Sequence, residues 1–399
     1  MWHVLADMLE ASVPEHSGRV TWRAFEDEDG ASHRALTVAW LDTIKDGWTA
    51  PTLHIDATLR IDLVRHIFPQ IELLDRITAA APHQHTVQYV GKSFSKAALK
   101  EDKEIDKVFH WAVAHGRRKG GEWLLGVQKD VKESIRARHA IPAWMHLAHH
   151  NNIAGRDEWR DVRGLIVVGR IMPRPIDVEQ VASVLTGSAT QYVGTEDHWY
   201  PTTDAVLSAR SGKAITVEKH IHPDPLAEQV RASICEDQIQ QIIWRGRGVN
   251  RSADHPLDVV ILGDCITAQP NEIENWYWPS LDDRIFAQTG VWMENASHVS
   301  RTFPLLTGNI ERIKKARQRL GTVSYKDYYR KTSLTSSPHL RTVTYRLTGP
   351  GQRQHQAVFD AREWADQDRV KGWIEGKLGA LASFEARGFE PDRGSGHKC

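Results

Sequence analysis

The stretch WLLGVQKDVKESIRAR, residues 123–138, decides the fold class because it contains one strand and one helix in succession. Residues 123–127 form a continuous apolar run, which is typical of a strand buried on both faces of a parallel sheet. Residues 129–138 follow directly and are expected to form a helix. Such a pair is the repeating unit of an α/β fold.

Apolar runs of the same kind recur on both sides of this unit. They predict further strands at residues 52–55, 87–90, 165–169 and 259–262. Two intervening segments have apolar residues at helical spacing, namely Ile105, Val108, Phe109, Ala112 and Val113 in the first, and Val178, Val181, Ala182 and Leu185 in the second. This alternation predicts a doubly wound parallel sheet.

The remaining sequence indicates how the domains are organised. Residues 1–80 precede the regular alternation, which occupies residues 81–268. Residues 186–222 interrupt it with a stretch rich in Thr, Ser, Tyr and His, which we interpret as an insertion or an irregular hairpin. Residues 269–390 combine a basic helical stretch with an alternating strand at 341–347, which predicts an α+β C-terminal extension. The tail 391–399 is expected to be disordered.

Composition excludes some classes of protein. The 399 residues suffice for two or three domains, and no run of 18 apolar residues predicts a membrane span. The first residues lack the pattern of a secretory signal, and the three cysteines form neither a CxxC pair nor a disulfide framework. We therefore expect a cytoplasmic protein. The 51 basic and 51 acidic residues balance, so any attraction to nucleic acid must come from a local patch.

The segment EDQIQQIIWRGRGVNR, residues 236–251, resembles motif VI of superfamily 2 helicases, whose core is Gln-x-x-Gly-Arg-x-x-Arg. Gln241 and Arg245 are four residues apart and share a helix face. Trp244 stands where the family has Gly, and Gly248 where the second Arg is usual, with Arg247 nearby. The resemblance implies that Gln241, Arg245 and Arg247 act on the γ-phosphate of ATP carried by another domain.

Two further segments are similar to motifs of the same family. The segment HHNNIAGRDEWRDVRGLIVVGR, residues 149–170, resembles motif V, which implies that Asn152, Gly155 and Asp157 couple the nucleotide to the nucleic-acid backbone. The segment LHIDATL, residues 53–59, resembles motif III, with Asp56 in place of Ser and with Thr58 retained.

The order of these motifs matches the second half of a superfamily 2 motor over about residues 50–265. The resemblance implies a RecA-like second domain, with residues 1–80 as the end strand of a first one. A P-loop is missing, because Thr86 occupies the position five residues before Gly91 where a glycine is required. A P-loop domain upstream or in trans would then hold ATP and Mg²⁺, and the chain alone would be inactive.

Nucleic acid is the expected second partner, DNA first and RNA as the other candidate. The C-terminal extension mixes cations with aromatic residues, a composition that suits phosphate contacts and base stacking. A solvated helix face gives a similar charge pattern. The candidates are Lys314, Lys315, Arg317, Arg319, Tyr328 and Arg330.

Two groups of histidines have spacings that could suit a metal, but a structural role is favoured for both. His146, His149 and His150 lack the glutamate of an HExxH motif, and we expect a polar helix end there. His220, His222 and Asp224 could suggest a metal or acid–base site, but Asp224-Pro225 favours a turn before a helix. No metal ligand is therefore predicted.

Two alternatives to the motor stay open. In the first, a RecA-like scaffold binds DNA or a replication partner without catalysis, and Ala at positions 245 and 247 would have no effect. In the second, an unrelated α/β enzyme carries its site in the 186–222 insertion.

Overall fold

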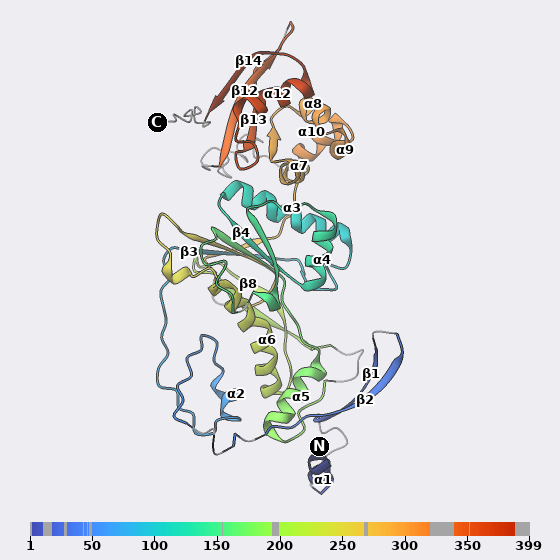
Figure 1. The fold of residues 1–399 in the computed structure, drawn as a ribbon, viewed down its shortest axis with the longest axis vertical. Coiled ribbons are helices and arrows are strands. Elements are labelled where there is room, and N and C mark those ends of the chain that lie inside the picture. Colours follow the sequence, from blue (N-terminus) through green and yellow to red (C-terminus); the bar gives the residue numbers. More distant parts are fainter. Residues whose placement is uncertain are drawn as a thin grey trace, which may run out of the picture.

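The computed structural model contains three regions along one long axis (Figure 1). Residues 1–80 lie at one end, a parallel sheet with its helices lies in the middle, and an antiparallel C-terminal domain lies at the other end. The structure describes the chain except for residues 1, 11–17, 28–29, 43, 46, 48–49, 154, 194–198, 267–269, 320–338, 351 and 388–399.

The central sheet has six strands, all parallel, in the order β10-β3-β9-β6-β4-β5. Their bounds are Gln84–Val90 (β3), Trp123–Val127 (β4), Met145–His149 (β5), Gly164–Val168 (β6), Leu257–Leu262 (β9) and Glu272–Asn275 (β10). The predicted mixed α/β class is confirmed, as are four of the five predicted strands. Strand β10 extends the sheet beyond the predicted boundary at residue 268.

The fifth predicted strand, at residues 52–55, is wrong. This segment has no regular structure, and its apolar side chains face solvent, with Leu53 70% and Ile55 89% exposed. A strand needs a neighbour to satisfy its backbone groups, and none of the described strands lies beside this segment. β-branched residues such as Thr52 and Ile55 therefore do not form a strand where no neighbouring strand is present.

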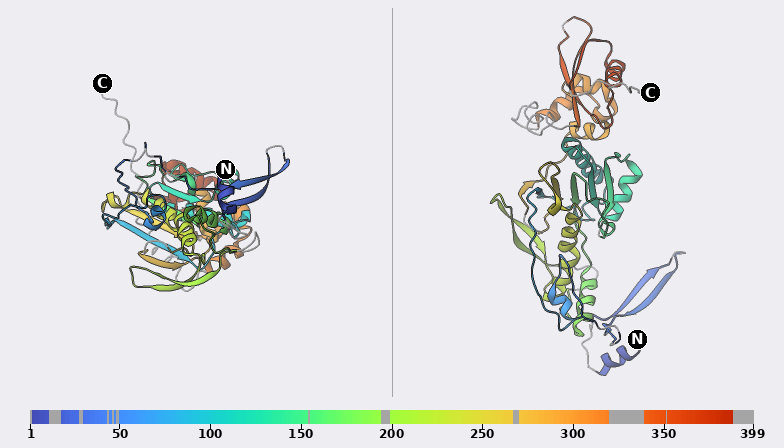
Figure 2. Two further views of the ribbon diagram at one scale, coloured as in Figure 1. Left: turned by 90° about the horizontal axis from the view of Figure 1, so that it is seen from below. Right: turned by 60° about the vertical axis from the view of Figure 1, so that its left-hand side comes forward.

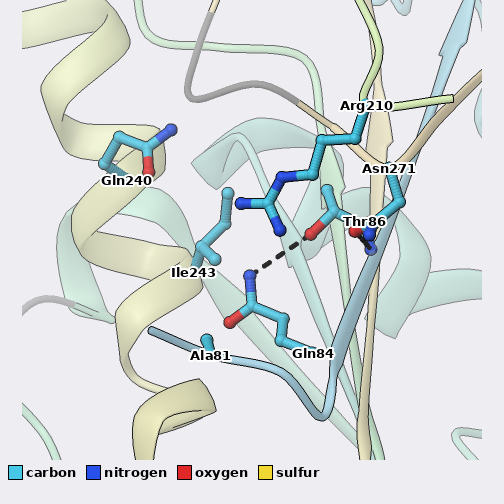
Figure 3. A pocket seen from close by; sticks show the side chains of 7 residues that line it. All are labelled: Ala81, Gln84, Thr86, Arg210, Gln240, Ile243 and Asn271. Carbon is cyan, nitrogen blue, oxygen red and sulfur yellow. Dashed lines mark hydrogen bonds between the residues drawn. The ribbon is translucent and has the colours of Figure 1, made fainter. Parts of the chain in front are cut away.

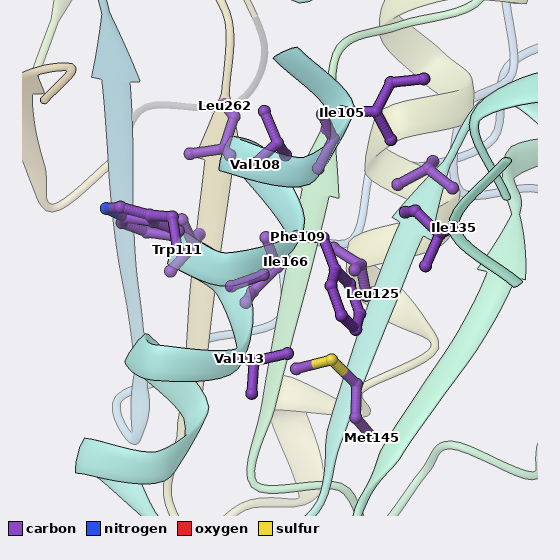
Figure 4. Close-up of a cluster of buried hydrophobic side chains, with 14 of the residues drawn as sticks. Ile105, Val108, Phe109, Trp111, Val113, Leu125, Ile135, Met145, Ile166 and Leu262 are labelled. Atoms are coloured by element: carbon purple, nitrogen blue, oxygen red, sulfur yellow. The ribbon is translucent and has the colours of Figure 1, made fainter. Parts of the chain in front are cut away.

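Helices cover both faces of the sheet. Helices α3 (Asp102–Lys119) and α4 (Lys129–Arg138) pack on one face, where Trp111 and Phe109 meet Leu125 and Ile166 (Figure 4). Helix α6 (Pro225–Trp244) and the connection after β5 pack on the other face. There the core members are Ile239, Ile242, Ile243, Ile153, Trp159, Leu165, Val167, Val259 and Ile261. Strands buried on both faces explain the continuous apolar runs.

The segment 186–222 contains a regular hairpin, which we had expected to be an insertion or an irregular hairpin. Its strands are β7 (Thr202–Ser208) and β8 (Ala214–His220), paired antiparallel without a bulge. Leu207 and Val217 of the hairpin pack against Val90, at the carboxyl end of β3, and against Ile273 of β10. The hairpin follows helix α5 (Pro175–Thr186), which packs on α6.

The C-terminal domain is α+β, with an antiparallel sheet of order β11-β13-β12-β14. Its elements are α7 (Leu281–Thr289), β11 (Val291–Met293), α8 (Ala296–Thr302), α9 (Pro304–Thr307), α10 (Ile310–Gln318), β12 (Leu340–Leu347), β13 (His355–Asp360), α12 (Gln367–Leu378) and β14 (Leu381–Arg387). The predicted basic helix and the predicted strand at 341–347 correspond to α10 and β12.

Buried ion pairs join this domain to helix α3. Arg117 donates to Asp360 over 2.8 Å, and these side chains are 2% and 0% exposed. Arg118 pairs with Asp283 of α7, and the guanidinium of Arg362 lies 4.0 Å from the ring centroid of Trp144. Such desolvated pairs fix the mutual orientation of two domains because neither partner can be left alone.

Residues 1–80 add no strand to the parallel sheet, although an end strand of a RecA-like domain was expected there. Their elements are α1 (Trp2–Glu10), β1 (Val20–Glu26), β2 (Ser32–Val38) and α2 (Ile61–Arg65). Strands β1 and β2 pair only with each other, and their hairpin projects from the body (Figures 1 and 2). None of the described helices is long and apolar enough to cross a membrane.

Candidate functional site

Helix α6 places the motif VI-like residues on the surface of the sheet domain. Asp224 caps its start by accepting from the amides of Leu226 and Ala227, so the predicted turn before a helix is confirmed. The isoleucines of α6 face the sheet, which turns Gln241 and Arg245 away from it. The helix ends where Gly246 lies against Leu257, so closely that a Cβ would come within 2.7 Å of that side chain.

The two arginines beyond the helix differ in their partners. The Arg245 side chain is half-buried, its Nε has no hydrogen-bond partner, and no described residue forms an ion pair with it. Arg247 adopts a left-handed backbone, with φ of 52°, and its guanidinium pairs with Asp157. A non-glycine residue in this conformation stores strain, which is common at functional sites. Arg245 is therefore the guanidinium available to an external anion.

The motif III-like segment packs on the exposed side of α6. The Gln241 amide donates to Thr58 Oγ1 over 3.0 Å, and Thr58 donates from its backbone and hydroxyl to Asp56. Arg60 forms a bidentate pair with Asp237, at 2.6 and 2.9 Å. The structure thus brings Asp56 and Thr58 to Gln241, which lies 183 residues after Thr58.

The motif V-like residues lie on the loop that follows β5. Asp157 is held by Arg247, Asn152 lies in the single helical turn His150–Asn152, and Gly155 has a φ of 80° with open space around its Cα. The expected helix end before this loop is wrong, because His146 and His149 belong to strand β5. His150 follows the end of β5 and is buried, and this burial lowers the pKa of its imidazole to about 4. No three possible metal ligands gather among the described side chains.

Two cavities flank α6, and sequence reasoning missed them both. The first, of about 50 Å³, lies between Gln240 of α6, Gln84 and Thr86 of β3, and Arg210 of the hairpin, whose guanidinium points into it (Figure 3). The second, of about 400 Å³, is lined by charged and amide side chains, namely Arg60, Lys219, Glu228, Gln229, Glu236, Asp237 and Gln240, with Ala232 and Ile266. Asp237 precedes Gln240 by three residues and Gln241 by four, so this polar face of α6 was the available signal.

The turn after β3 is not a phosphate cradle. The Gly91 amide donates to Asp264 Oδ1 over 3.0 Å. The Lys92 ammonium lies 5.1 Å from the ring centroid of Trp278 and 3.9 Å from Glu104. Both groups that a P-loop would aim at phosphates therefore have partners within the protein.

The nucleic-acid candidates of the extension divide into three groups. The prediction that Arg317 contacts nucleic acid is wrong. Its guanidinium pairs with Asp282 at 3.0 Å and donates to the carbonyls of Met293 and Glu294, and only 12% of the side chain is exposed. Helix α10 has an apolar face at Ile313 that buries Arg317 with it. The exposed candidates are Lys314, Lys315 and Arg319; Tyr328 and Arg330 lie outside the described residues.

Charge is unevenly divided between the domains. Residues 281–387 contain 18 lysines and arginines against 11 aspartates and glutamates, a net charge of +7, although the whole chain is balanced. The C-terminal domain is therefore the basic part of the molecule.

Comparison of the chain with family models, curated proteins and solved structures gave no match.

Proposed function

We propose that this chain is the C-terminal half of an ATP-dependent nucleic-acid motor of the superfamily 2 helicase type. Its six-stranded sheet would be the second RecA-like domain. Arg245 would reach the γ-phosphate of an ATP molecule bound with Mg²⁺ to a P-loop on another domain. The permanent charge and flat geometry of a guanidinium suit the charge that develops there during phosphoryl transfer.

One observation carries the proposal. Arg245 stands without an ionic partner at the end of α6, above a parallel sheet, while Arg247 beside it is neutralised by Asp157. Leaving a half-buried guanidinium unpaired costs stability, so the fold gains from an external anion at this point. Gln241 supports the arrangement from the same helix face by binding Thr58.

The N-terminal region supports a missing partner domain. Trp22 of β1 is 66% exposed, and it pairs across the hairpin with Leu36, which is 47% exposed. A two-stranded hairpin is marginally stable in water, and its apolar face has no cover among the described residues. We propose that the P-loop domain, upstream or in trans, covers residues 1–80 and thereby faces α6.

The basic C-terminal domain would supply nucleic-acid contacts. Lys315 and Arg319 are exposed on and just after α10, and Lys314 is exposed in a pair with Glu311, whereas Arg317 is held by Asp282. DNA is the proposed nucleic acid, and RNA is the competitor in the same binding assay.

ATPase kinetics test the proposal. The purified chain should not hydrolyse ATP, and the chain joined to its P-loop domain should. In the joined protein, Arg245→Ala should lower kcat by about 10³-fold or more, the usual effect of an arginine finger. Nucleic-acid binding should survive, which checks that the variant folds.

The alternative, a non-catalytic DNA-binding protein on the same scaffold, gives the opposite result. In that case, Arg245→Ala leaves both ATP turnover and DNA binding of the joined protein unchanged. Arginine-dependent hydrolysis by the chain alone would overturn the division of labour proposed here.

A further inference from the structure

Three aromatic residues follow strand β10 and form a rigid, partly exposed surface. Trp276 anchors them, because its ring centroid lies 5.0 Å from that of Phe94 and 5.0 Å from that of Trp111, inside the core between β3 and α3. Tyr277 stacks on Trp276 at 22°, and Trp278 meets it edge-on at 5.5 Å. Tyr277 and Trp278 remain 39% and 36% exposed. Two neighbouring rings are thus fixed from beneath and reach solvent.

Ammonium groups surround the outer ring. Lys92 and Lys107 lie 5.1 and 4.6 Å from the ring centroid of Trp278. Both also reach Glu104, at 3.9 and 2.6 Å, and the hydrogen bond from Lys107 helps to hold the pKa of Glu104 below its usual range. The outer ring and two ammonium groups therefore lie side by side.

This surface follows the carboxyl end of β10, the edge strand that pairs with β3. The Gly91–Asp264 hydrogen bond ties the turns after β3 and β9 together beside it. The topological switch point of the sheet lies elsewhere, between β6 and β4, because the chain runs from β6 to β9 and from β4 the opposite way to β5. Tyr277 and Trp278 are therefore a surface at the edge of the sheet, outside that crevice.

We propose that Tyr277 and Trp278, with Lys92 and Lys107, form a binding site for single-stranded nucleic acid. Unpaired bases would stack on the two rings, and the backbone phosphates would take the two lysines from Glu104. Only a single strand presents base faces to such rings, because a duplex stacks its bases on one another. The inference rests on the proposed nucleic-acid role of the module, but it requires neither ATP nor a second domain.

Fluorescence anisotropy of the full chain with labelled oligothymidylate, longer than the ~4–16 nucleotides that such sites cover, tests the site. Tyr277→Ala and Trp278→Ala should each weaken binding by about tenfold or more, the loss expected when one stacking ring is removed. Trp278→Phe should retain most of the affinity. Lys92→Ala should reduce the slope of log K against log salt by about 0.7, the value for one phosphate contact on a single strand.

Trp199→Ala is the matched control, because this ring is 47% exposed beyond the sheet domain, near the hairpin. Its affinity should equal that of the unmodified chain. Urea denaturation checks that Tyr277→Ala and Trp278→Ala unfold at the same midpoint as the unmodified chain. The inference is overturned if these folded variants bind oligothymidylate as tightly as the unmodified chain does. It is also overturned if duplex DNA competes as well as the single strand. A failed ATPase test with intact ring-dependent binding would remove the motor and leave this site standing.

Discussion

Residues 1–80 and residues 84–387 differ in how far their apolar side chains are exposed to solvent. Of the twenty-three large apolar side chains that stay exposed in the described part of the chain, fourteen lie in residues 1–80. No described side chain of that region is buried, whereas the rest of the chain contains every member of the six core clusters. The larger region closes its own core, and the smaller one does not.

The contacts that hold the two regions together explain the difference. Residues 1–80 reach the body mainly through polar groups, the Arg60–Asp237 pair and the Thr58–Gln241 hydrogen bond, with Leu63 packed beside α5 and α6. Polar contacts at a surface contribute little free energy, about 0–1 kcal/mol each. The region is therefore positioned by the body without being stabilised by it, which fits a surface that another domain covers.

The largest expected effect lies within the body. Asp360→Ala leaves the guanidinium groups of Arg117 and Arg362 beside an empty, buried position. We expect the free energy of unfolding to fall by about 3–5 kcal/mol, the usual cost of breaking a buried ion pair from one side. Urea denaturation measures it.

Asp237→Ala is the matched control for that change, because its pair with Arg60 is partly exposed. It should lower the free energy of unfolding by about 1 kcal/mol or less. Equal losses in the two variants would contradict the division between a closed body and a weakly held N-terminal region.

The sequence predicted the sheet better than the site, for a physical reason. Continuous apolar runs such as Trp123–Val127 are typical of strands covered on both faces, and every residue of this strand is buried. Residues 52–55 are Thr-Leu-His-Ile, a shorter stretch that includes two polar residues, and they have no neighbouring strand. Which arginine is free also depends on distance in space, because Asp157 lies 90 residues from Arg247.

Acidification gives the next largest effect and acts on the body. Burial, with His355 and Arg301 nearby, lowers the pKa of His298 from 6.5 to about 4. The unfolded chain then binds the proton more readily than the folded chain does. The contribution of His298 to the free energy of unfolding is therefore fully present above pH 6.5 and is lost as the pH falls toward 4. The loss from this one group is about 3 kcal/mol.

Urea denaturation at several pH values measures that slope. His298→Gln should flatten it by about one proton, roughly 1.4 kcal/mol per pH unit. His54→Gln, in the exposed N-terminal region, is the control and should leave the slope as it is. An unchanged slope in His298→Gln would show that the buried imidazole does not contribute.

The smallest effect concerns the contact between the two regions. Arg60→Ala should change the free energy of unfolding by less than about 1 kcal/mol, because the pair is only partly buried. It should nevertheless release the segment around Thr58, and limited proteolysis should then cut residues 50–60 faster. Protection of that segment equal to the parent chain would mean that other contacts hold it.

The most direct test of the central claim compares two arginines that differ in their partners. In the chain joined to its P-loop domain, Arg245→Lys should lower kcat for ATP hydrolysis by about 10³-fold, because an ammonium cannot replace a guanidinium at the γ-phosphate. Arg247→Lys should keep most of the activity, since Asp157 already engages that side chain. Equal rates for both variants, whether high or low, would contradict the assignment of Arg245 to a phosphate on another domain.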